Sequence, residues 1–377
     1  MKRNILMVVN KGQGYLGPSE TFLQSQIDGL PCNVELLIGN PNERRIGNGS
    51  NNFLLSNNLF AKGLRWLARV LKLTTLHAQD NKAVENYLKQ NTYDAVLAQY
   101  GPTAVSIMDA CKNADIPLVV HFHGYDAYVQ YYLDKYQQGY KQLFETAASI
   151  IAVSTHMKEQ LIKLGAPANK LNYSACGADT PSTQISERTK LNQKYAMVGR
   201  LTEKKAPMLS IIAFKKLTVS HPEAQLEIIG DGPLMDGCVQ LSRALNLQDN
   251  IIFHGAQPHT QVVKLLTESR VFLQHSVRAP NGDMEGTPVG VLEAMAMGLA
   301  VISTKHGGIM DVIDSEDIGI LVDEHDYEQM ASALIELANN DERVKKIGIA
   351  AQKRIGERWT NQHSIDRLWQ VLESVMR

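Results

Sequence analysis

The sequence predicts an α/β protein made of two Rossmann-like, doubly wound domains. Its 377 residues exceed one typical core, so two domains of roughly 150 to 200 residues are expected. Short apolar runs alternate with helical patterns in both halves of the chain, as in folds built around parallel sheets. Some of these runs end in a glycine-containing loop that leads into a helix, which is how a doubly wound unit begins.

Composition and charge are those of an ordinary globular protein. Apolar residues make up 44% of the chain and charged residues 20%, and the formal net charge is −1. We expect no nucleic-acid partner. No apolar run reaches the roughly 18 residues of a membrane-spanning helix, and the start, MKRNILMVVN, lacks the cleavage site of a signal peptide. The cysteines are too scattered for a zinc or redox site, so a cytoplasmic setting is expected: Cys32, Cys111, Cys176 and Cys238.

The first domain is expected to open with a strand at 4–9, a flexible loop and a helix at 20–29 that Ser19 caps. Ligands of doubly wound folds bind beyond the strand ends, so the loop is a candidate wall of a binding site. Its glycine spacing does not match the dinucleotide-binding fingerprint. A second strand at 33–39 and a polar connection at 40–58 follow. The loop contains Gly12, Gly14, Gly17 and Pro18.

Residues 59–78 predict an amphipathic helix with a cationic and an apolar face. The pattern is typical of a helix on an anionic membrane surface, and it also fits a surface helix packed on the domain core. We favour core packing for the apolar face and keep a membrane contact through 59–73 as a further hypothesis. The cationic face contains Lys62, Arg65, Arg69 and Lys72, the apolar face contains Phe60, Leu64, Leu67 and Leu71, and Trp66 flanks both.

His123 is the first candidate site residue, because it lies at the carboxyl end of a predicted strand, where substrates bind in this architecture. We expect His121 and His123 to point to opposite faces and so not to share a metal ion. The elements expected before it are a helix at 80–90, a strand at 93–101, a helix at 104–113 and the strand at 118–122.

Five tyrosines fall within 128–144, which we interpret as a helix packed against the core; a wall for sugar or lipid packing is the alternative. A strand and a helix capped by Ser154 are expected within 149–165. Residues 172–179 close the first domain, and the polar segment 180–189 is the predicted linker.

The second domain is expected to open with a strand that ends at Gly199. Arg200 and Lys205 then lie in a loop before a helix that Pro207 starts. Charge-assisted hydrogen bonds from Arg and Lys are the strong way to hold a diphosphate, so this loop is a candidate anion site. Further strands are expected at 227–230, 251–255, 271–276 and 318–323, and helices at 326–339 and 359–376.

The stretch DMEGTPVGVLEAMAMGLAVISTKHGG (283–308) contains the second candidate anion site. We expect Thr287 to cap a helix with Pro288 at its first position, and Gly298 to end it before a strand at 300–303. A helix N-terminus binds anions, because its unpaired N–H groups and dipole point outward together. Glu285 and Glu293 would repel a phosphate and are better placed to accept hydrogen bonds from hydroxyls. A sugar nucleotide supplies both groups.

This stretch resembles the signature of retaining glycosyltransferases with two Rossmann-like domains facing a cleft, the GT-B architecture. The resemblance rests on two glutamates separated by seven residues, on EGTPVGVLEAMAMGLAVIST and on the downstream GGIMDVI. It covers nearly the whole C-terminal half and, more thinly, the N-terminal half. The large family includes bacterial exopolysaccharide, lipopolysaccharide and phosphatidylinositol glycosyltransferases, and HFHGYDA, EKKAP and APNGDMEGTPV resemble its exopolysaccharide and lipopolysaccharide members most closely.

The resemblance implies residue roles. Arg200 and Lys205, in GRLTEKKA, would bind the donor diphosphate, and His123, in HGYD, would contact the transferred sugar or the attacking hydroxyl. Glu285 would bind sugar hydroxyls and Glu293 the ribose. Gly17, Gly286 and the backbone N–H groups of Thr287 and Val289 would complete the donor site, although relatives commonly have glycine where Pro288 stands. The final helix is expected to return to the first domain.

The predicted organisation is therefore an acceptor-binding domain at 1–179, joined by helix 359–377, and a donor-binding domain at 190–358. The predicted reaction moves a sugar from a UDP or GDP donor to a hydroxyl of a lipid-linked or polysaccharide-precursor acceptor, with retention and without a cofactor or metal. The expected location is cytoplasmic, with peripheral contact to the inner membrane as a further hypothesis. Two alternatives stay open: a sugar-nucleotide epimerase of similar fold, and a non-catalytic sugar-nucleotide-binding subunit.

Overall fold

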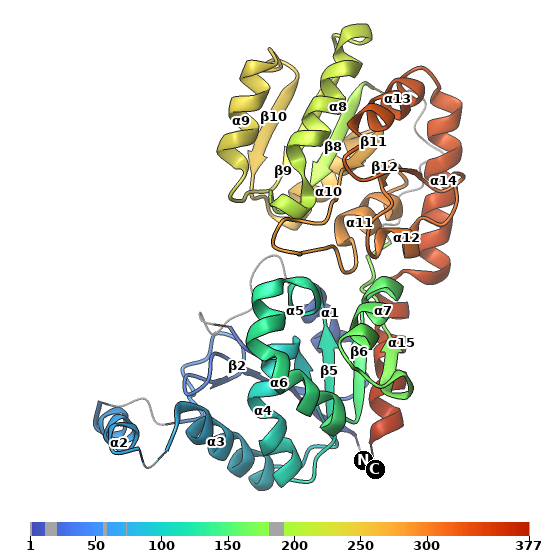
Figure 1. Cartoon of the computed structure of the whole chain (residues 1–377). Coiled ribbons are helices and arrows are strands. Elements are labelled where there is room, and N and C mark those ends of the chain that lie inside the picture. The colour runs from blue at the N-terminus through green and yellow to red at the C-terminus, as the bar shows by residue number, and fades with distance from the viewer. Residues whose placement is uncertain (1, 12–20, 56–58, 73, 181–191, 377) are drawn as a thin grey trace. The chain divides into compact units, whose positions relative to one another are not determined.

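The computed structural model describes residues 2–11, 21–55, 59–72, 74–180 and 192–376, which form two compact α/β units (Figure 1). Unit 1 comprises Met1–Ala175 and Ser364–Arg377, and unit 2 comprises Cys176–His363. The division falls a few residues from the boundaries expected from sequence, at 179 and 359. The segment just after residue 175 belongs to unit 2 because Ala178 bridges to Thr360 there.

Unit 1 is built on a seven-stranded sheet with the order β3-β2-β1-β4-β5-β6-β7. All neighbouring strands are parallel except β2 and β3. Buried apolar runs on the central strands account for the parallel arrangement, since both faces of such a sheet are covered by helices. The strands are β1 (Asn4–Val9), β2 (Asn33–Ile38), β3 (Arg45–Ile46), β4 (Ala95–Gln99), β5 (Leu118–Phe122), β6 (Ser149–Ala152) and β7 (Leu171–Tyr173).

The helices of unit 1 follow the predicted order, and the last helix of the chain packs into its core. Ile365, Leu368 and Leu372 of that helix are buried against side chains of β1, β2 and α1. Ser154 caps α7 as expected, because its hydroxyl accepts the Met157 N–H at 3.1 Å. The helices are α1 (Thr21–Gly29), α2 (Leu59–Val70), α3 (Leu76–Gln90), α4 (Gly101–Asn113), α5 (Tyr125–Tyr128), α6 (Gln130–Thr146), α7 (Thr155–Lys163) and α15 (Asn361–Val375).

The amphipathic helix differs from its prediction in two respects. It ends at Val70 and not near residue 78, because Lys72 has a left-handed backbone (φ 57°) and Thr75 caps a separate helix, α3. Its apolar side chains are not packed on the core: Leu64 and Leu67 are 53% and 45% exposed, and Trp66 is 58% exposed. The expectation of core packing for this face is therefore wrong.

Unit 2 contains a six-stranded, fully parallel sheet with the order β10-β9-β8-β11-β12-β13. Its strands are β8 (Lys194–Val198), β9 (Gln225–Ile229), β10 (Ile251–Gly255), β11 (Val271–Gln274), β12 (Ala300–Thr304) and β13 (Ile320–Val322). Its helices are α8 (Pro207–Ser220), α9 (Met235–Ala244), α10 (His259–Glu268), α11 (Val289–Ala296), α12 (Ile309–Val312), α13 (Tyr327–Ala338) and α14 (Asp341–Arg358).

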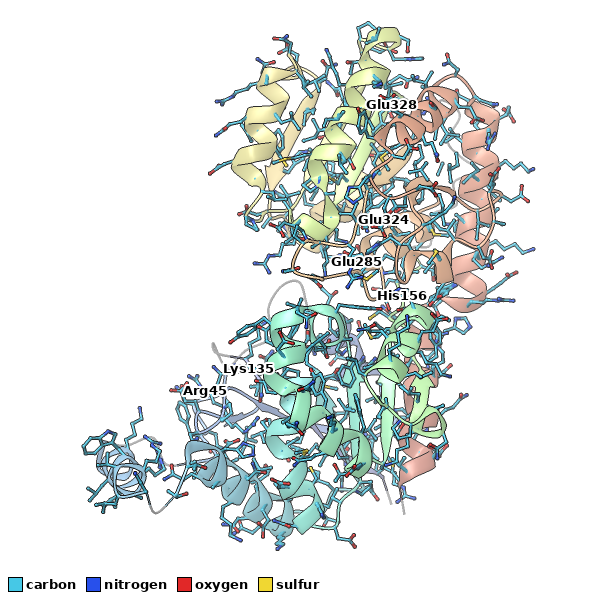
Figure 2. All side chains as sticks on the ribbon, in the orientation of Figure 1. Arg45, Lys135, His156, Glu285, Glu324 and Glu328 are labelled. Atoms are coloured by element: carbon cyan, nitrogen blue, oxygen red, sulfur yellow. The ribbon has the colours of Figure 1, made fainter. Side chains whose placement is uncertain are left out.

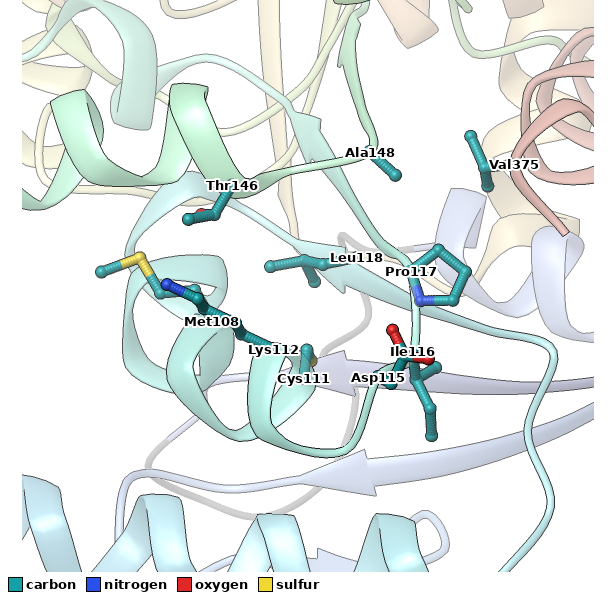
Figure 3. Close-up of a pocket in the computed structure, with 10 residues that line it drawn as sticks. All are labelled: Met108, Cys111, Lys112, Asp115, Ile116, Pro117, Leu118, Thr146, Ala148 and Val375. Carbon is teal, nitrogen blue, oxygen red and sulfur yellow. The ribbon is translucent and has the colours of Figure 1, made fainter. Parts of the chain in front are cut away.

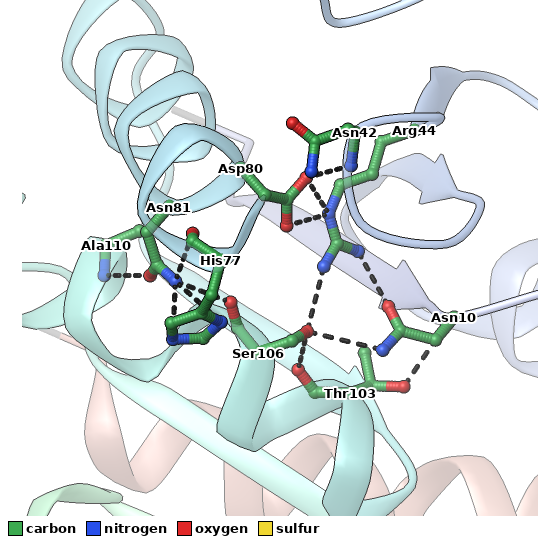
Figure 4. A network of polar contacts seen from close by, with 9 residues as sticks. All are labelled: Asn10, Asn42, Arg44, His77, Asp80, Asn81, Thr103, Ser106 and Ala110. Carbon is green, nitrogen blue, oxygen red and sulfur yellow. Dashed lines mark hydrogen bonds and ion pairs between the residues drawn. The ribbon is translucent and has the colours of Figure 1, made fainter. Parts of the chain in front are cut away.

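A buried polar network holds the β2–α3 connection of unit 1 in place (Figure 4). The Arg44 guanidinium donates from Nε to Asp80 Oδ2 at 2.9 Å, and both side chains are inaccessible to solvent. Its remaining nitrogens donate to Asn10 Oδ1 and Ser106 Oγ, each at 2.8 Å. The Asn42 N–H also donates to Asp80. Four separate segments are thus joined around one buried ion pair, which is costly to break because breaking it leaves an uncompensated charge.

Replacing Asp80 by alanine is expected to destabilise the protein by about 3 to 5 kcal/mol, because Arg44 would stay buried without its counter-ion. Urea unfolding followed by circular dichroism measures this change. Lys82→Ala is the matched control on the same helix, since Lys82 is exposed and its partner Glu85 keeps a second ion pair, with Lys89. Equal unfolding midpoints for the two variants would contradict the assigned role of the network.

Candidate functional site

The candidate site lies where the strand order of the unit 2 sheet reverses direction. The chain runs outward from β8 through β9 to β10 on one side, and from β11 through β12 to β13 on the other. Loops after β8 and β11 therefore meet at the carboxyl edge of the sheet, at the topological switch point. Ligands of doubly wound folds bind at this position.

The loop after β8 presents the two predicted cations. Gly199 has a positive φ of 143°, and a Cβ at this position would lie 3.3 Å from Lys205 Cε, so the close approach favours glycine. A short 3₁₀ turn at Glu203–Lys205 then leads to Ala206, which has a left-handed backbone, and to Pro207 at the first position of α8. This sharp turn directs Lys205 back over the end of the sheet.

Lys205 bridges the two loops. Its Nζ lies 3.2 Å from Glu285 Oε1 and 3.2 Å from the side-chain carbonyl of Gln274, the last residue of β11. The side chains of Lys205 and Glu285 are 16% and 6% exposed, so this ion pair is largely screened from solvent. The structure thus brings together two residues that are 80 positions apart in the sequence and were both predicted for the donor site.

Arg200 lies in the same loop but is exposed. No ion pair of its guanidinium is found among the described residues. The side chain is therefore available to an incoming anion, without first losing a protein partner.

The backbone around Glu285 is held by His306 and Glu324, two residues that sequence reasoning missed. The Glu285 N–H donates to His306 Nε2 at 3.1 Å, and His306 Nδ1 lies 2.6 Å from Glu324 Oε1. Figure 2 labels Glu285 and Glu324, which come from different loops of unit 2. Gly307 has a φ of 48°, and a Cβ there would lie 2.4 Å from the Glu285 carbonyl oxygen, so this contact requires glycine.

The Glu285 carboxylate is kept charged although it is buried. Burial by itself raises the pKa of the carboxyl, but the positive charges of Lys205 and Lys204 outweigh burial and hold the net pKa below its ordinary value. Its Oε1 atom is inaccessible to solvent and, apart from the ion pair with Lys205, accepts no hydrogen bond. An ionised carboxylate without bound donors is suited to accept hydroxyl groups.

The N-terminus of α11 differs in detail from the prediction. Pro288 occupies the N-cap position, and Thr287 does not cap the helix, because its hydroxyl accepts the Cys176 N–H at 3.2 Å. The Val289 N–H, predicted to face the donor, donates to the Thr287 carbonyl instead. The backbone N–H groups of Gly290 and Val291 have no partner in the described part of the chain. They are the donors that the helix N-terminus offers to an anion.

The two remaining residues predicted for the donor site lie on either side of the N-terminus of α11. Gly286 is buried directly after Glu285. Glu293 lies one helical turn after Val289, the first residue of α11, and its Oε1 atom is 3.8 Å from His259 Nδ1. Burial raises the pKa of the Glu293 carboxyl, and the negative charge of Asp179 adds to this, while His259 opposes it. Glu293 therefore binds a proton more readily than Glu285.

His123 belongs to unit 1, where it follows the carboxyl end of β5. Its Nε2 lies 2.6 Å from Gln99 Oε1, and Asp126 accepts its backbone N–H at 3.1 Å. Burial and the neighbouring His121 hold the pKa of His123 well below its ordinary value, so the ring is neutral. The rings of His121 and His123 are 4.2 Å apart, so the expectation of opposite faces is wrong: alternate residues of a strand share one face.

Aromatic rings surround His123. Phe22 and Tyr100 lie 4.7 and 4.9 Å from its ring centre, and Tyr100 also contacts Tyr125. The helix with the predicted tyrosine run, α6, is buried at Tyr140, while Tyr131 on the same helix is 63% exposed. Part of the run therefore packs on the core, as expected, and part faces solvent. Gly17, predicted for the donor site, and the linker at 181–189 lie outside the described residues.

A cavity of about 440 Å³ in unit 1 lies at the opposite end of the sheet from His123 (Figure 3). It is lined by residues at the end of α4 and the start of β5, including Cys111, Lys112 and Leu118, and by Val375 of α15. Because ligands of parallel sheets bind at the carboxyl ends of the strands, we assign no role to it.

The described ranges contain no group of three or more His, Cys, Asp or Glu side chains arranged to hold a metal ion. None of the helices in these ranges has both the length and the apolar character needed to cross a bilayer. Metal independence stays a prediction.

Two family models match the chain. The model described as glycosyl transferases group 1 matches residues 182–354, and the model described as glycosyltransferase family 4 matches residues 48–181. The amylovoran biosynthesis glycosyltransferase of Erwinia amylovora is 31% identical over 260 residues, which are 68% of this chain and 63% of that protein. The putative colanic acid biosynthesis glycosyltransferase of Escherichia coli K12 is 31% identical over 284 residues, 73% of this chain and 68% of that protein. The chain thus spans about two thirds of the length of these relatives.

Solved structures show the same fold at low sequence identity. HepE of Anabaena, crystallised with UDP, superposes with a TM-score of 0.73 at 18% identity, covering 99% of this chain and all of that one. The lipopolysaccharide outer core galactosyltransferase WaaB superposes with a TM-score of 0.70 at 21% identity, covering 98% and 99%. The matched family models, the curated relatives and the two parallel-sheet units agree with the paired-glutamate signature, and the chain therefore belongs to the group 1 glycosyltransferases with the GT-B fold.

Proposed function

We propose that the chain transfers a sugar from a UDP or GDP donor to a hydroxyl of a lipid-linked or polysaccharide-precursor acceptor, with retention at the anomeric carbon. The observation that carries this proposal is the contact of Lys205 with Glu285 at the switch point of unit 2. One cation for a diphosphate and one carboxylate for hydroxyls, side by side, match the two ends of a nucleotide sugar. The relatives named for amylovoran and colanic acid biosynthesis support a polysaccharide precursor, and the UDP complex of HepE supports a nucleotide donor.

The reaction needs stabilisation of the leaving diphosphate more than it needs a nucleophile from the protein. The bond between the anomeric carbon and the diphosphate oxygen breaks, and a bond from the acceptor oxygen forms on the same face of the sugar. The acceptor proton passes to the departing diphosphate. Lys205, Arg200 and the free N–H groups at the start of α11 offset the negative charge that develops there, which is where electrostatic catalysis contributes most.

Glu285 and Glu293 bind the two carbohydrate parts of the donor in this proposal. Glu285, charged and without hydrogen-bond donors on Oε1, accepts hydroxyls of the transferred sugar. Glu293, further down α11, accepts the ribose hydroxyls. His123 is a positioning residue, since a ring held neutral by burial is a poor base. Neither a metal nor another cofactor is required, because the cations and amides supply the positive charge.

We further propose that α2 contacts an anionic membrane surface, which would place the enzyme at the cytoplasmic face of the inner membrane. The helix exposes Leu64, Trp66 and Leu67 together with the basic Lys62. Figure 1 shows α2 beside the start of α3, apart from the sheet of unit 1. Exposed apolar and cationic side chains on one helix match an interface of acyl chains and anionic headgroups. A lipid-linked acceptor would be found at the same surface.

An epimerase and a non-catalytic binding subunit remain the alternatives from other functional classes. An epimerase would convert a nucleotide sugar without an acceptor, whereas a transferase consumes donor only as it forms a new glycosidic bond or hydrolyses it. A non-catalytic subunit would bind the donor and keep its cellular function when Glu285 is replaced by alanine.

Arg200→Ala and Lys205→Ala are each expected to weaken nucleotide-sugar binding by about 10- to 100-fold, because a charged hydrogen bond contributes about 1.5 to 3 kcal/mol. Thermal-shift screening of UDP and GDP sugars identifies the donor, and calorimetry then measures its affinity. Lys216→Ala is the control, since this exposed lysine pairs with Glu328 on α13. Unchanged affinity in both site variants would show that the diphosphate binds elsewhere.

Glu285→Gln and Glu293→Gln are expected to separate the two carbohydrate contacts. Glu285→Gln should leave the affinity for the free nucleotide unchanged, while the affinity for the nucleotide sugar and the transfer rate fall about tenfold or more. Glu293→Gln should weaken both ligands equally, because both contain ribose. The assignment is wrong if Glu285→Gln weakens the free nucleotide as much as the nucleotide sugar.

Flotation with vesicles is expected to recover the protein on anionic but not on neutral lipid at low salt. Replacing Lys62, Arg65 and Arg69 by serine should abolish flotation, and Leu64→Ser with Leu67→Ser should reduce it, because the two faces contribute independently. A triple Lys→Ser variant at exposed Lys305, Lys346 and Lys353 of unit 2 controls for the loss of net charge. Failure of the wild-type chain to float at low salt would rule out this role for α2.

A further inference from the structure

We propose that His306 and Glu324 form a relay that positions Glu285 for the transferred sugar. The inference rests on the proposed function, since it assigns a task to residues that hold the same site. It adds two positioning residues to the proposed donor site and explains how a buried carboxylate is oriented although Lys205 is its one charged partner in the protein.

The relay consists of three groups in line within unit 2. The Glu285 N–H donates to His306 Nε2 at 3.1 Å. On the other side of the ring, His306 Nδ1 lies 2.6 Å from Glu324 Oε1. The His306 ring is 1% exposed, so water does not compete for either nitrogen. Both hydrogen bonds are therefore sheltered, which increases the cost of losing either.

The two partners of the His306 ring, a backbone N–H and a carboxylate, determine which ring nitrogen carries the proton. A backbone N–H can only donate, so His306 Nε2 must carry a lone pair. A carboxylate can only accept, so His306 Nδ1 must carry the proton. Only the neutral Nδ1–H tautomer satisfies both ends. The two hydrogen bonds thus fix the tautomer of His306.

Glu324 is itself anchored by the loop that contains Glu285. Its Oε2 atom accepts the Arg278 N–H at 2.9 Å. Burial raises the pKa of the Glu324 carboxyl, but the hydrogen bonds from His306 and from the Arg278 N–H outweigh burial, so the net pKa lies below its ordinary value. The relay therefore ties together the loops that follow β11, β12 and β13, and Glu285 lies on the first of them.

Positioning through the backbone solves a problem specific to Glu285. Its carboxylate contacts one protein cation, Lys205, at Oε1, and must otherwise stay available if it is to bind sugar hydroxyls. The main chain on both sides of the residue is fixed instead, by His306 at the N–H and by Gly307 close to the carbonyl oxygen. A shift of this backbone would move the carboxylate relative to Lys205.

His306→Ala is expected to reproduce the Glu285→Gln phenotype: unchanged affinity for the free nucleotide, and an about tenfold or larger loss of nucleotide-sugar affinity and transfer rate. If the histidine acts through Glu285, the double variant should be no worse than the worse single variant, as a double-mutant cycle measures. Gly307→Ala should give the same pattern with the relay chemistry intact, because its Cβ would push on the Glu285 carbonyl oxygen. His306→Gln should recover part of the loss, since its side-chain oxygen can accept the Glu285 N–H.

Nitrogen-15 NMR of histidine-labelled protein tests the tautomer without any substrate. The signal that disappears in His306→Gln should show a protonated Nδ1 and an unprotonated Nε2. His325→Asn is the control for both experiments, because His325 is exposed and adjacent to Glu324. An Nε2–H tautomer, or additive losses in the double variant, would overturn the relay. If Glu285→Gln alone leaves nucleotide-sugar affinity unchanged, the proposed function fails instead.

Discussion

The proposed donor site of this glycosyltransferase depends on the ion pair between Lys205 and Glu285. Each charge would be unfavourable alone at a position that is largely screened from solvent, and together they stabilise the close approach of the loops after β8 and β11. The pair also keeps the carboxylate ionised, because the positive charge of Lys205 outweighs the effect of burial on the Glu285 pKa. In the proposed function, a nucleotide sugar binds by exchange, with its diphosphate at the cation and its hydroxyls at the acid.

Sheet topology explains why these residues meet. In unit 2 the connections leave β8 and β11 in opposite directions, so their loops are neighbours at the switch point. Backbone geometry then sets the distances: the positive φ of Gly199 allows Lys205 to fold back over the strand end, and Gly307 allows a second loop to approach Glu285. The proposed site thus uses few charged side chains, and glycines in the neighbouring loops allow these side chains to come close together.

Sequence reasoning predicted the fold class and nearly all the strands, because these depend on local patterns, and it selected candidate donor residues from a family signature, which stay a prediction. It missed interactions between residues distant in the sequence. The Thr287 hydroxyl accepts an N–H from Cys176, 111 residues away, and so does not cap α11 as its local sequence suggests. His306 and Glu324 are 18 residues apart with nothing in the sequence to link them. For α2 the periodicity predicted an amphipathic helix correctly. Whether other elements pack on its apolar face depends on the rest of the domain, which the local sequence does not show.

A crystal structure with bound UDP or GDP would test the donor site most directly. The account predicts diphosphate oxygens within hydrogen-bond distance of Lys205 Nζ, of the Arg200 guanidinium and of the backbone N–H groups of Gly290 and Val291, with ribose hydroxyls at Glu293. A diphosphate bound away from this edge of the unit 2 sheet, with the contact between Lys205 and Glu285 unchanged, would contradict it.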